Sequence, residues 1–245
     1  MAISFVESTG NATINGGNVT ITLPGSYTAG DVAYVAVTLG TSKATTLACR
    51  SSSGGPYSQI ISTINSSFAR FGVFRQVIPS SSGLTQAVVT GSGGSTDATA
   101  AVCHIFRGVD QSTPEDATPT STTGNSSLPD SPSITVVSCS CVIISAQGSQ
   151  SVISFTAPSS FNNSQNAIGN DTRDASVSAA WILNASTAAF NPAAWTNTTG
   201  TAAWCSATIA LRPAAGTTID WAALFAGPDI SSQIDEMRRV TVTSY

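Results

Sequence analysis

Few residues of this chain have side chains that could do chemistry, and the single histidine is the first of them. His104 lies in the apolar run 99–107, so a Ser-His-Asp or Cys-His arrangement would have to use it. In an extended strand His104 shares a face with Val102 and Phe106, whereas Cys103 points to the opposite face. The chain also has no Gly-x-Ser-x-Gly sequence to supply a serine nucleophile. We therefore predict that His104 is a strand residue without a catalytic role.

The five cysteines show no metal-binding pattern. They are Cys49, Cys103, Cys139, Cys141 and Cys205, an odd number without Cys-x-x-Cys spacing. We expect Cys139 and Cys141 on one face of a strand, with no further His or Cys nearby to complete four zinc ligands. Free cysteine is among the most buried residue types, which favours small core residues over metal or disulfide roles.

Three carboxylates follow the run that contains His104. Asp110, Glu115 and Asp116 are clustered in one predicted loop. A glycosidase needs two carboxylates that face each other across a sugar, and a calcium loop needs regular acidic spacing, which is absent. We interpret the three as solvated turn residues, with calcium binding as the less favoured alternative. No metal or cofactor is predicted.

Tryptophans could form a platform for stacking sugars. Trp181 and Trp204 lie in apolar runs and are predicted to be core residues. Trp195 lies in the polar segment 191–199, so it is the best candidate for an exposed glycan contact. The alternative is that this segment simply closes over one end of the fold.

Composition sets wider limits on function. Of 245 residues only 9% are charged, against roughly a quarter in typical proteins, while 41% are hydrophobic. The net charge is −4, and the nine basic residues are scattered between Lys43 and Arg239, which argues against nucleic-acid binding. The Gly-rich residues 91–95 lack the lysine of a phosphate loop. A surface of hydroxyls and amides suits a protein that packs closely in many copies.

The elements that must position these residues are short strands. Apolar or alternating runs divided by Gly, Pro, Ser and Asn predict antiparallel sheets. We expect strands at residues 18–23, 31–39, 68–78, 85–90, 99–107, 133–138, 139–146, 175–183 and 202–211. Runs 68–78 and 85–90 are predicted to form a hairpin, and residues 111–132 a long loop. The predicted fold is an all-β, antiparallel, jelly-roll-like β-sandwich over residues 1–213.

Residues 214–245 form a predicted C-terminal extension of different character. It contains an apolar stretch with Trp221 and Phe225, and a charge-dense stretch, 231–238, predicted to be helical. A short strand is expected at 240–243. The candidate assembly residues are Trp221, Phe225, Met237, Arg238 and Arg239. The extension either packs back on the sandwich or reaches a neighbouring subunit.

Three segments together resemble a Ser/Thr-rich β-sandwich protein type that occurs in the virion and tail-associated proteins of phages. They are Thr28-Ala-Gly-Asp-Val-Ala-Tyr-Val-Ala36, Ala101-Val-Cys-His-Ile-Phe-Arg-Gly-Val-Asp110 followed by Thr113-Pro114, and Trp204-Cys-Ser-Ala-Thr-Ile-Ala-Leu-Arg-Pro213. The resemblance covers about residues 3–213. We expect Gly30 and Gly108 to provide turn geometry, and Asp31 and Asp110 to accept hydrogen bonds from backbone amides. The resemblance brings no catalytic residues.

The sequence thus predicts a non-enzymatic structural protein of a bacteriophage particle, as a head decoration, fibre or tail-associated subunit. Its expected partners are copies of itself and other virion proteins. The alternative is a carbohydrate-binding or adhesive module that contacts host surface glycans. The chain starts without a signal-peptide pattern and contains no apolar stretch of about 18 residues, so we expect synthesis in the host cytoplasm, no membrane insertion and a place on the virion surface.

Overall fold

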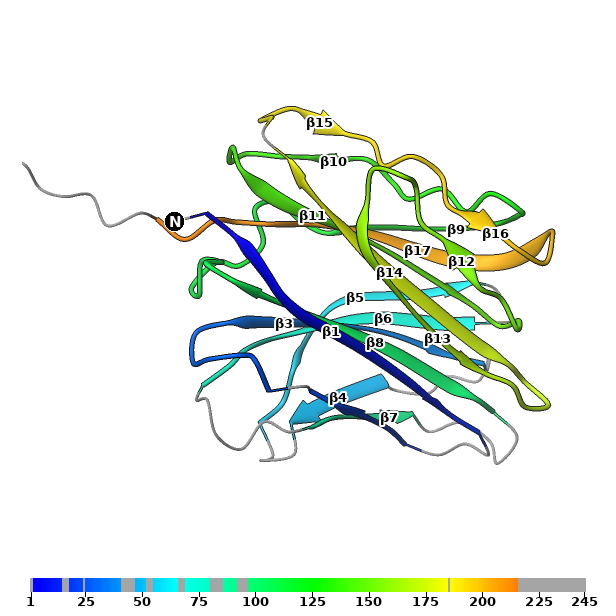
Figure 1. The fold of residues 1–245 in the computed structure, drawn as a ribbon. Coiled ribbons are helices and arrows are strands. Elements are labelled where there is room, and N and C mark those ends of the chain that lie inside the picture. Colours follow the sequence, from blue (N-terminus) through cyan, green and yellow to red (C-terminus); the bar gives the residue numbers. More distant parts are fainter. Residues whose placement is uncertain are drawn as a thin grey trace, which may run out of the picture. The chain divides into compact units, whose positions relative to one another are not determined.

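The structure, a computed structural model, describes residues 2–14, 18–23, 25–40, 47–51, 55–65, 69–79, 86–91, 97–184 and 186–215. Within these ranges every regular element is a β-strand, and all strand pairs within the sheets are antiparallel (Figure 1). This confirms the predicted all-β class and antiparallel pairing. Among the described residues, no helix is long and apolar enough to cross a membrane.

The first main sheet comes entirely from the N-terminal half of the chain. Its strand order is β1 (Ser4–Thr13), β8 (Thr99–Arg107), β3 (Val32–Leu39), β6 (Ala69–Val77) and β5 (Ser58–Asn65). Strand β3 is buried along its whole length, and β8 is buried up to Phe106. Both faces of this sheet therefore need to be covered by other parts of the chain.

The second main sheet comes from the C-terminal half. Its strand order is β13 (Asn162–Gly169), β14 (Ala175–Asn184), β11 (Cys141–Ser149), β17 (Ala202–Leu211) and β9 (Thr120–Ser126). Strand β11 is fully buried, and β17 is buried from Trp204 onward. This sheet has the same need for cover on both faces.

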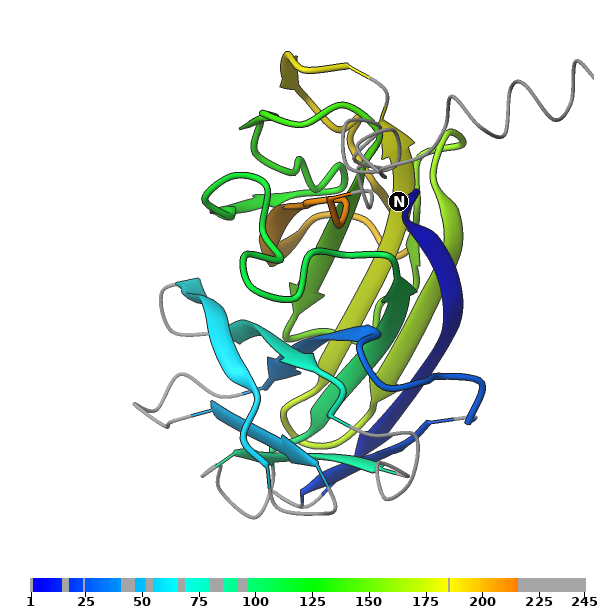
Figure 2. The same ribbon diagram turned by 90° about the vertical axis from the view of Figure 1, so that its left-hand side faces the viewer.

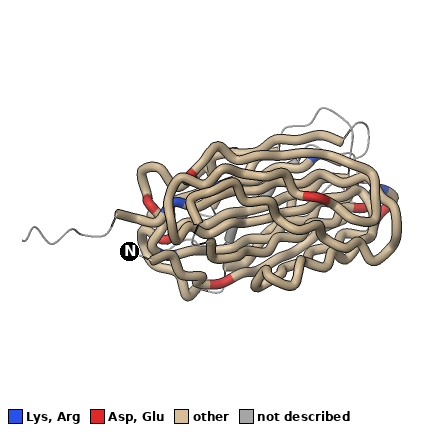
Figure 3. Tube along the Cα trace, turned by 90° about the horizontal axis from the view of Figure 1, so that it is seen from above, with Lys and Arg blue, Asp and Glu red and all other residues tan. Residues whose placement is uncertain are grey.

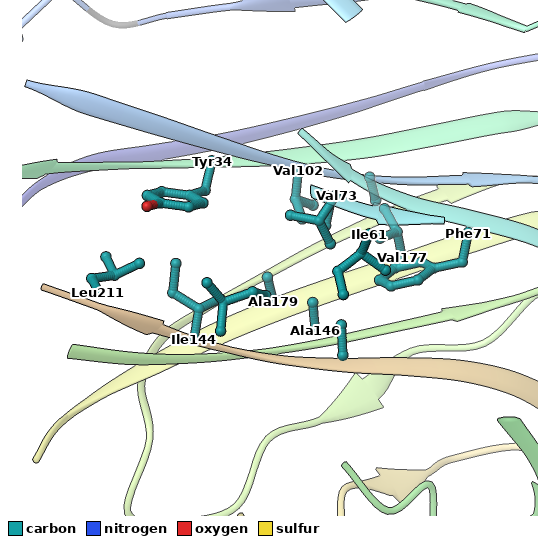
Figure 4. Packing of buried hydrophobic residues seen from close by; sticks show 14 of the residues in the cluster. Tyr34, Ile61, Phe71, Val73, Val102, Ile144, Ala146, Val177, Ala179 and Leu211 are labelled. Atoms are coloured by element: carbon teal, nitrogen blue, oxygen red, sulfur yellow. The ribbon is translucent and has the colours of Figure 1, made fainter. Parts of the chain in front are cut away.

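The inner faces of the two main sheets pack against each other and form the largest core. Alternate residues of β3 (Val32, Tyr34, Ala36) meet alternate residues of β11 (Val142, Ile144, Ala146) in this layer. Figure 4 shows Tyr34 and Val102 on one side and Ile144 and Ala179 on the other. The predicted sandwich is thus two main sheets placed face to face, since side chains of alternate residues on a strand point to one face.

Smaller sheets cover the outer faces. The N-terminal half contributes β2 (Val19–Thr22), β7 (Gln86–Gly91) and β4 (Leu47–Ser51), in that order. The C-terminal half contributes the pair β10 (Ile134–Thr135) and β15 (Ala189–Phe190), and the pair β12 (Phe155–Thr156) and β16 (Thr196–Asn197). Figures 1 and 2 show these small strands on the outer sides of the two main sheets.

Separate outer cores lie under these small sheets. Val35 and Val37 of β3 pack with Ile21 of β2 on the N-terminal side. On the C-terminal side Ile143 of β11 packs with Ile134 of β10, and Ala180 of β14 packs with Trp195. The strands at the centre of each main sheet therefore contribute to an inner core and to an outer core.

Several expectations about connectivity need correction. The runs predicted as a hairpin became β6 and β7, but β6 pairs with β3 and β5, whereas β7 pairs with β2 and β4. The predicted loop 111–132 contains β9, and of residues 133–138 only Ile134–Thr135 form a strand. A jelly roll of the whole domain is not confirmed, because each main sheet comes from one half of the chain.

Residues Ala2–Ala214 form one compact unit. The predicted boundary at residue 213 and the role of the extension stay predictions. The expected helix at 231–238, the expected strand at 240–243 and the candidate residues Trp221, Phe225, Met237, Arg238 and Arg239 lie outside the described residues.

Turn geometry before β3 follows the prediction from the sequence. Gly30 has φ +88°, and Gly108 after β8 has φ +79°, a region that favours glycine. Asp31 accepts a hydrogen bond from the Thr28 amide at 2.7 Å, and its two oxygens also bind the Arg107 guanidinium at 2.9 and 2.8 Å. The buried Asp31 carboxylate thus joins the turn before β3 to the end of β8.

A second buried carboxylate holds the turn before β11. Asp116 accepts hydrogen bonds from the Val137 and Ser138 amides at 2.7 and 2.9 Å, and Arg212 Nε lies 3.6 Å from its other oxygen. Burial raises the pKa of Asp116, but the hydrogen bonds from Ser138 and Val137 and the charge of Arg212 outweigh it, so the net shift is downward. Asp116 is therefore a structural anion and not a solvated loop residue.

We predict that Asp116→Asn lowers the free energy of unfolding at pH 7 by about 1 to 3 kcal/mol, because a buried charge-assisted network loses its acceptor charge. Since the folded pKa lies below the unfolded one, the carboxylate stabilises the fold above the unfolded value, and this stabilisation is lost as pH falls through the folded pKa. The deficit of the variant should shrink at pH 3. Urea unfolding at both pH values measures it.

The matched control is Asp130→Asn, which changes an exposed carboxylate in the same half of the chain. It should leave the free energy of unfolding within about 0.5 kcal/mol of the parent at pH 7. A deficit for Asp116→Asn that is the same at pH 7 and pH 3 would contradict the anionic role.

Candidate functional site

His104 lies inside the sandwich, between the two main sheets. Its side chain is 1% exposed, and Nε2 is 2.9 Å from the carbonyl oxygen of Asn163 on β13. The ring lies near Phe5 and Phe106, with centroid distances of 6.0 and 6.4 Å. Cys103 packs in the outer core instead, which confirms that the imidazole and this thiol point to opposite faces.

The electrostatic state of His104 suits a structural role. Burial lowers the pKa of His104 to about 4, and the hydrogen bond to Asn163 only partly opposes that shift. The imidazole is therefore neutral at pH 7, and its partner is a backbone carbonyl. What this arrangement does chemically is bridge β8 to β13, because a neutral Nε2–H can donate to the Asn163 oxygen.

The three carboxylates that are clustered in the sequence, Asp110, Glu115 and Asp116, contact different partners. Asp110 accepts hydrogen bonds from the amides of Ser112 and Thr113 at 2.9 and 3.0 Å, as predicted for a turn residue. Glu115 pairs with Arg75 of β6 and accepts from the Tyr34 hydroxyl at 3.2 Å, and Asp116 is bound as described above. Among the described residues no group of three or more His, Cys, Asp or Glu could hold a metal ion.

Trp195 was expected to be exposed, and this expectation is wrong. The side chain is 0% exposed and lies in an outer core with Ile153, Phe155 and Ala180. Its indole N–H donates to Ser145 Oγ at 2.7 Å. The alternative interpretation of segment 191–199, in which it closes over the fold, describes the observed position. Trp204 is buried as predicted, and Trp181 packs against the inner core.

Trp195 covers a buried polar network that we did not predict from the sequence. Ser131 Oγ lies 2.7 Å from Ser145 Oγ and 2.8 Å from Ser206 Oγ, and the Gln147 side-chain amide donates to Ser131 and Ser206 at 2.7 and 3.0 Å. All four side chains are at most 1% exposed. A signal did exist in the sequence, because Ser145 and Gln147 alternate with the apolar Ile144 and Ala146 within one strand.

The cysteines are mostly core residues, as predicted. Cys49, Cys103, Cys141 and Cys205 are buried and unpaired, and burial raises the pKa of Cys49 and of Cys205 to about 12. These thiols are therefore protonated and unreactive at neutral pH. Cys139 is exposed and precedes β11, so the prediction that it shares a strand face with Cys141 is wrong.

Charge on the described residues is concentrated in ion pairs. Arg75, Arg107, Arg173 and Arg212 lie within 4 Å of Glu115, Asp31, Asp97 and Asp116, respectively. Figure 3 shows few charged positions along the strands. The edge strands β9 and β13, which read TSTTGNS and NNSQNAIG, carry no charge at all and present mainly hydroxyl and amide side chains.

No protein-family model matches the chain, and no curated protein matches it. The resemblance to phage β-sandwich proteins therefore stays a prediction.

We predict that folding stability depends on pH through His104. The unfolded chain binds a proton at the ordinary imidazole pKa of about 6.5, whereas the folded chain does not do so until about pH 4. The free energy of unfolding should therefore fall by about 3 kcal/mol as pH is lowered from 6.5 to 4. His104→Gln, which keeps an N–H donor but does not titrate, should lack this part of the decrease in urea unfolding. Parallel pH profiles for the two proteins would argue against it.

We also predict that Trp195 acts on stability. Trp195→Ala should lower the free energy of unfolding by about 3 to 5 kcal/mol, because it removes a fully buried aromatic side chain. Trp195→Phe should lose less, since it keeps most of the ring volume and gives up the hydrogen bond to Ser145. Thermal and urea unfolding measure both variants. An alanine variant as stable as the parent would contradict the buried position.

Proposed function

We propose that this protein is a non-enzymatic structural component of a bacteriophage particle, acting at the virion surface through assembly of many copies with itself and with other virion proteins. The observation that carries the proposal is the surface of the described domain. Its edge strands β9 and β13 are uncharged, and four of its arginines are paired with carboxylates of the same domain. Burying such a surface between many copies costs little desolvation free energy, because the largest desolvation penalty in an interface comes from unpaired charges.

The edge strand β9 illustrates this surface. Its residues alternate between half-buried and exposed, and the exposed ones are Ser121, Thr123 and Asn125. Short hydroxyl and amide side chains lose less rotamer freedom on contact than the Lys and Glu side chains that usually cover protein surfaces. Proteins that must stay apart place charge on sheet edges, and this chain does not do so here.

The side chains that could take part in a reaction are held in contacts that stabilise the fold, which supports a role without catalysis. His104 bridges two sheets, Glu115 and Asp116 are held by arginines, and four of the cysteines are buried. Trp195, the side chain suggested for glycan binding, is inaccessible, so we do not propose a carbohydrate site at that residue.

We predict that the native full-length protein forms a discrete oligomer and that a chain ending at Ala214 is a folded monomer. The cut is placed there because the Ala214 amide donates to the Gly108 carbonyl at 2.7 Å, so earlier truncation would remove part of the domain. Multi-angle light scattering gives the mass of each form, and circular dichroism checks that the sheet is retained.

Point variants in the extension sharpen the test. Trp221→Ala with Phe225→Ala should shift the oligomer toward monomer, whereas the matched change Ser231→Ala with Ser232→Ala should not. Full-length protein that is monomeric alone and also fails to bind purified particles that lack it would overturn the proposal.

A further inference from the structure

The two halves of the domain have the same strand order. We number the five main-sheet strands of each half in chain order and leave out the outer strands. In each main sheet the first strand lies at an edge, followed by the fifth, the second, the fourth and the third. This describes β1-β8-β3-β6-β5 for the N-terminal half and, read from β9, β9-β17-β11-β14-β13 for the C-terminal half. The outer strands also follow one pattern, since β2 and β10 lie between the first and second main strands of each half, and β4 and β12 between the second and third.

Strand registers agree residue by residue. Val32 of β3 pairs with Phe106 of β8 on one side and Val77 of β6 on the other. Val142 of β11 pairs in the same way with Leu211 of β17 and Leu183 of β14. Both ladders then continue for eight residues without a shift, so residue 32 corresponds to 142 and residue 39 to 149.

The turns before the second main strands match in detail. Gly30 and Ser140 lie two residues before Val32 and Val142, and both have positive φ, +88° and +60°. The amides of the corresponding residues Thr28 and Ser138 both donate to an aspartate carboxylate.

The arginines that bind these aspartates match as well. Arg107 is the last residue of β8 and Arg212 directly follows β17, and they pair with Asp31 and Asp116, respectively. The two aspartates come from different places in the sequence, so the geometry has been kept while the residue that supplies it differs.

Contacts between the halves obey a twofold rule. Close to a twofold axis that exchanges the halves, each residue lies near its corresponding residue. The ends of β3 and β11 show this arrangement. A Cβ atom added to Gly148 would meet the hydroxyl of Thr38, its corresponding residue. The Gln150 side chain donates to the carbonyl of Gly40, again its corresponding residue, at 3.1 Å. The edges agree too, since β1 lies beside β13 and β5 beside β9.

We propose that the domain is a homodimer brought into one chain: the inner face of each half is a self-complementary interface, and the partner that it fits is a second copy of the same unit. In a twofold dimer the same surface patch is used by both subunits. The N-terminal half with its outer strands then follows the jelly-roll order, with β1-β8-β3-β6 as one sheet and β2-β7-β4 as the other, except that β5 pairs with β6; in the C-terminal half the outer strands form the two pairs β10-β15 and β12-β16. This inference does not depend on the proposed phage role.

Side chains at the axis have diverged in a compensating way. Phe71 and Val177 are corresponding residues, paired in their own sheets with Thr38 and Gly148. Phe71 Cδ2 lies 2.6 Å from the place of a Gly148 Cβ, so the large ring fills the space above glycine. The twofold rule places the smaller Val177 above Thr38. Phenylalanine thus lies over glycine on one side, and the correspondence predicts valine over threonine on the other.

Two cycles of compensating substitutions on the full chain test the equivalence. Gly148→Thr should strongly lower the urea midpoint of unfolding, because the new side chain meets Phe71 and Thr38. Adding Thr38→Gly and Phe71→Val together removes both groups that the new side chain meets and copies the valine and threonine of the other side, so it should restore most of the loss. Reciprocally, Val177→Phe should lower the midpoint, and adding Thr38→Gly should restore it.

The control cycle combines Phe71→Val with Gly124→Thr. A Cβ at Gly124 would meet the Trp204 ring, so this change should be damaging and should not be rescued. Where a single variant does not fold, recovery of folded protein in the compensated variant is the readout. Rescue in both twofold cycles and not in the control supports the proposal. Failure of either twofold cycle, or equal rescue in the control, overturns it.

Discussion

The structure depends on one constraint: the strands at the centre of each main sheet are buried on both faces. A strand of this kind cannot border water, and in many proteins helices cover the second face. Here the chain covers it with its own short strands. The inner faces are buried against each other, and β2, β4 and β7 in one half and β10, β12, β15 and β16 in the other cover the outer faces. The layered arrangement follows from that demand.

The same constraint explains which strands were predictable. Residues 99–107 and 202–211, predicted from the sequence, are the observed bounds of β8 and β17, and 31–39 and 175–183 differ from β3 and β14 by one residue. These strands are buried, so their composition is distinctive. The edge strands β1, β5, β9 and β13 were not predicted, because half-buried polar strands such as TSTTGNS resemble loops. Pairing was misjudged for β6 and β7, since adjacency in sequence does not specify which sheet a strand joins.

The position of a side chain could be predicted where local geometry determines it. It could not be predicted where a partner distant in the sequence determines it. Strand alternation was enough to separate His104 from Cys103, and turn chemistry was enough to assign Asp31 and Asp110. Asp116 looked like a loop residue because the amides that it binds are about twenty residues away and Arg212 is farther still. Trp195 looked exposed because its neighbours are polar. Its burial depends on Ser145, fifty residues earlier, which offers the hydroxyl that its indole N–H requires.

The outer cores of the two halves show that one backbone arrangement tolerates two chemistries. Val35, Val37 and Cys103 fill the N-terminal core, whereas the corresponding Ser145, Gln147 and Thr208 carry hydroxyl and amide groups. Buried polar groups are stabilised by hydrogen-bond partners, and in the C-terminal half Ser131 and Trp195 donate to or accept from Gln147 and Ser145, whereas Val35 and Val37 need no such partners. The covering segments of the two halves are therefore not interchangeable. What the halves share is strand order, register and turn geometry, which the backbone sets.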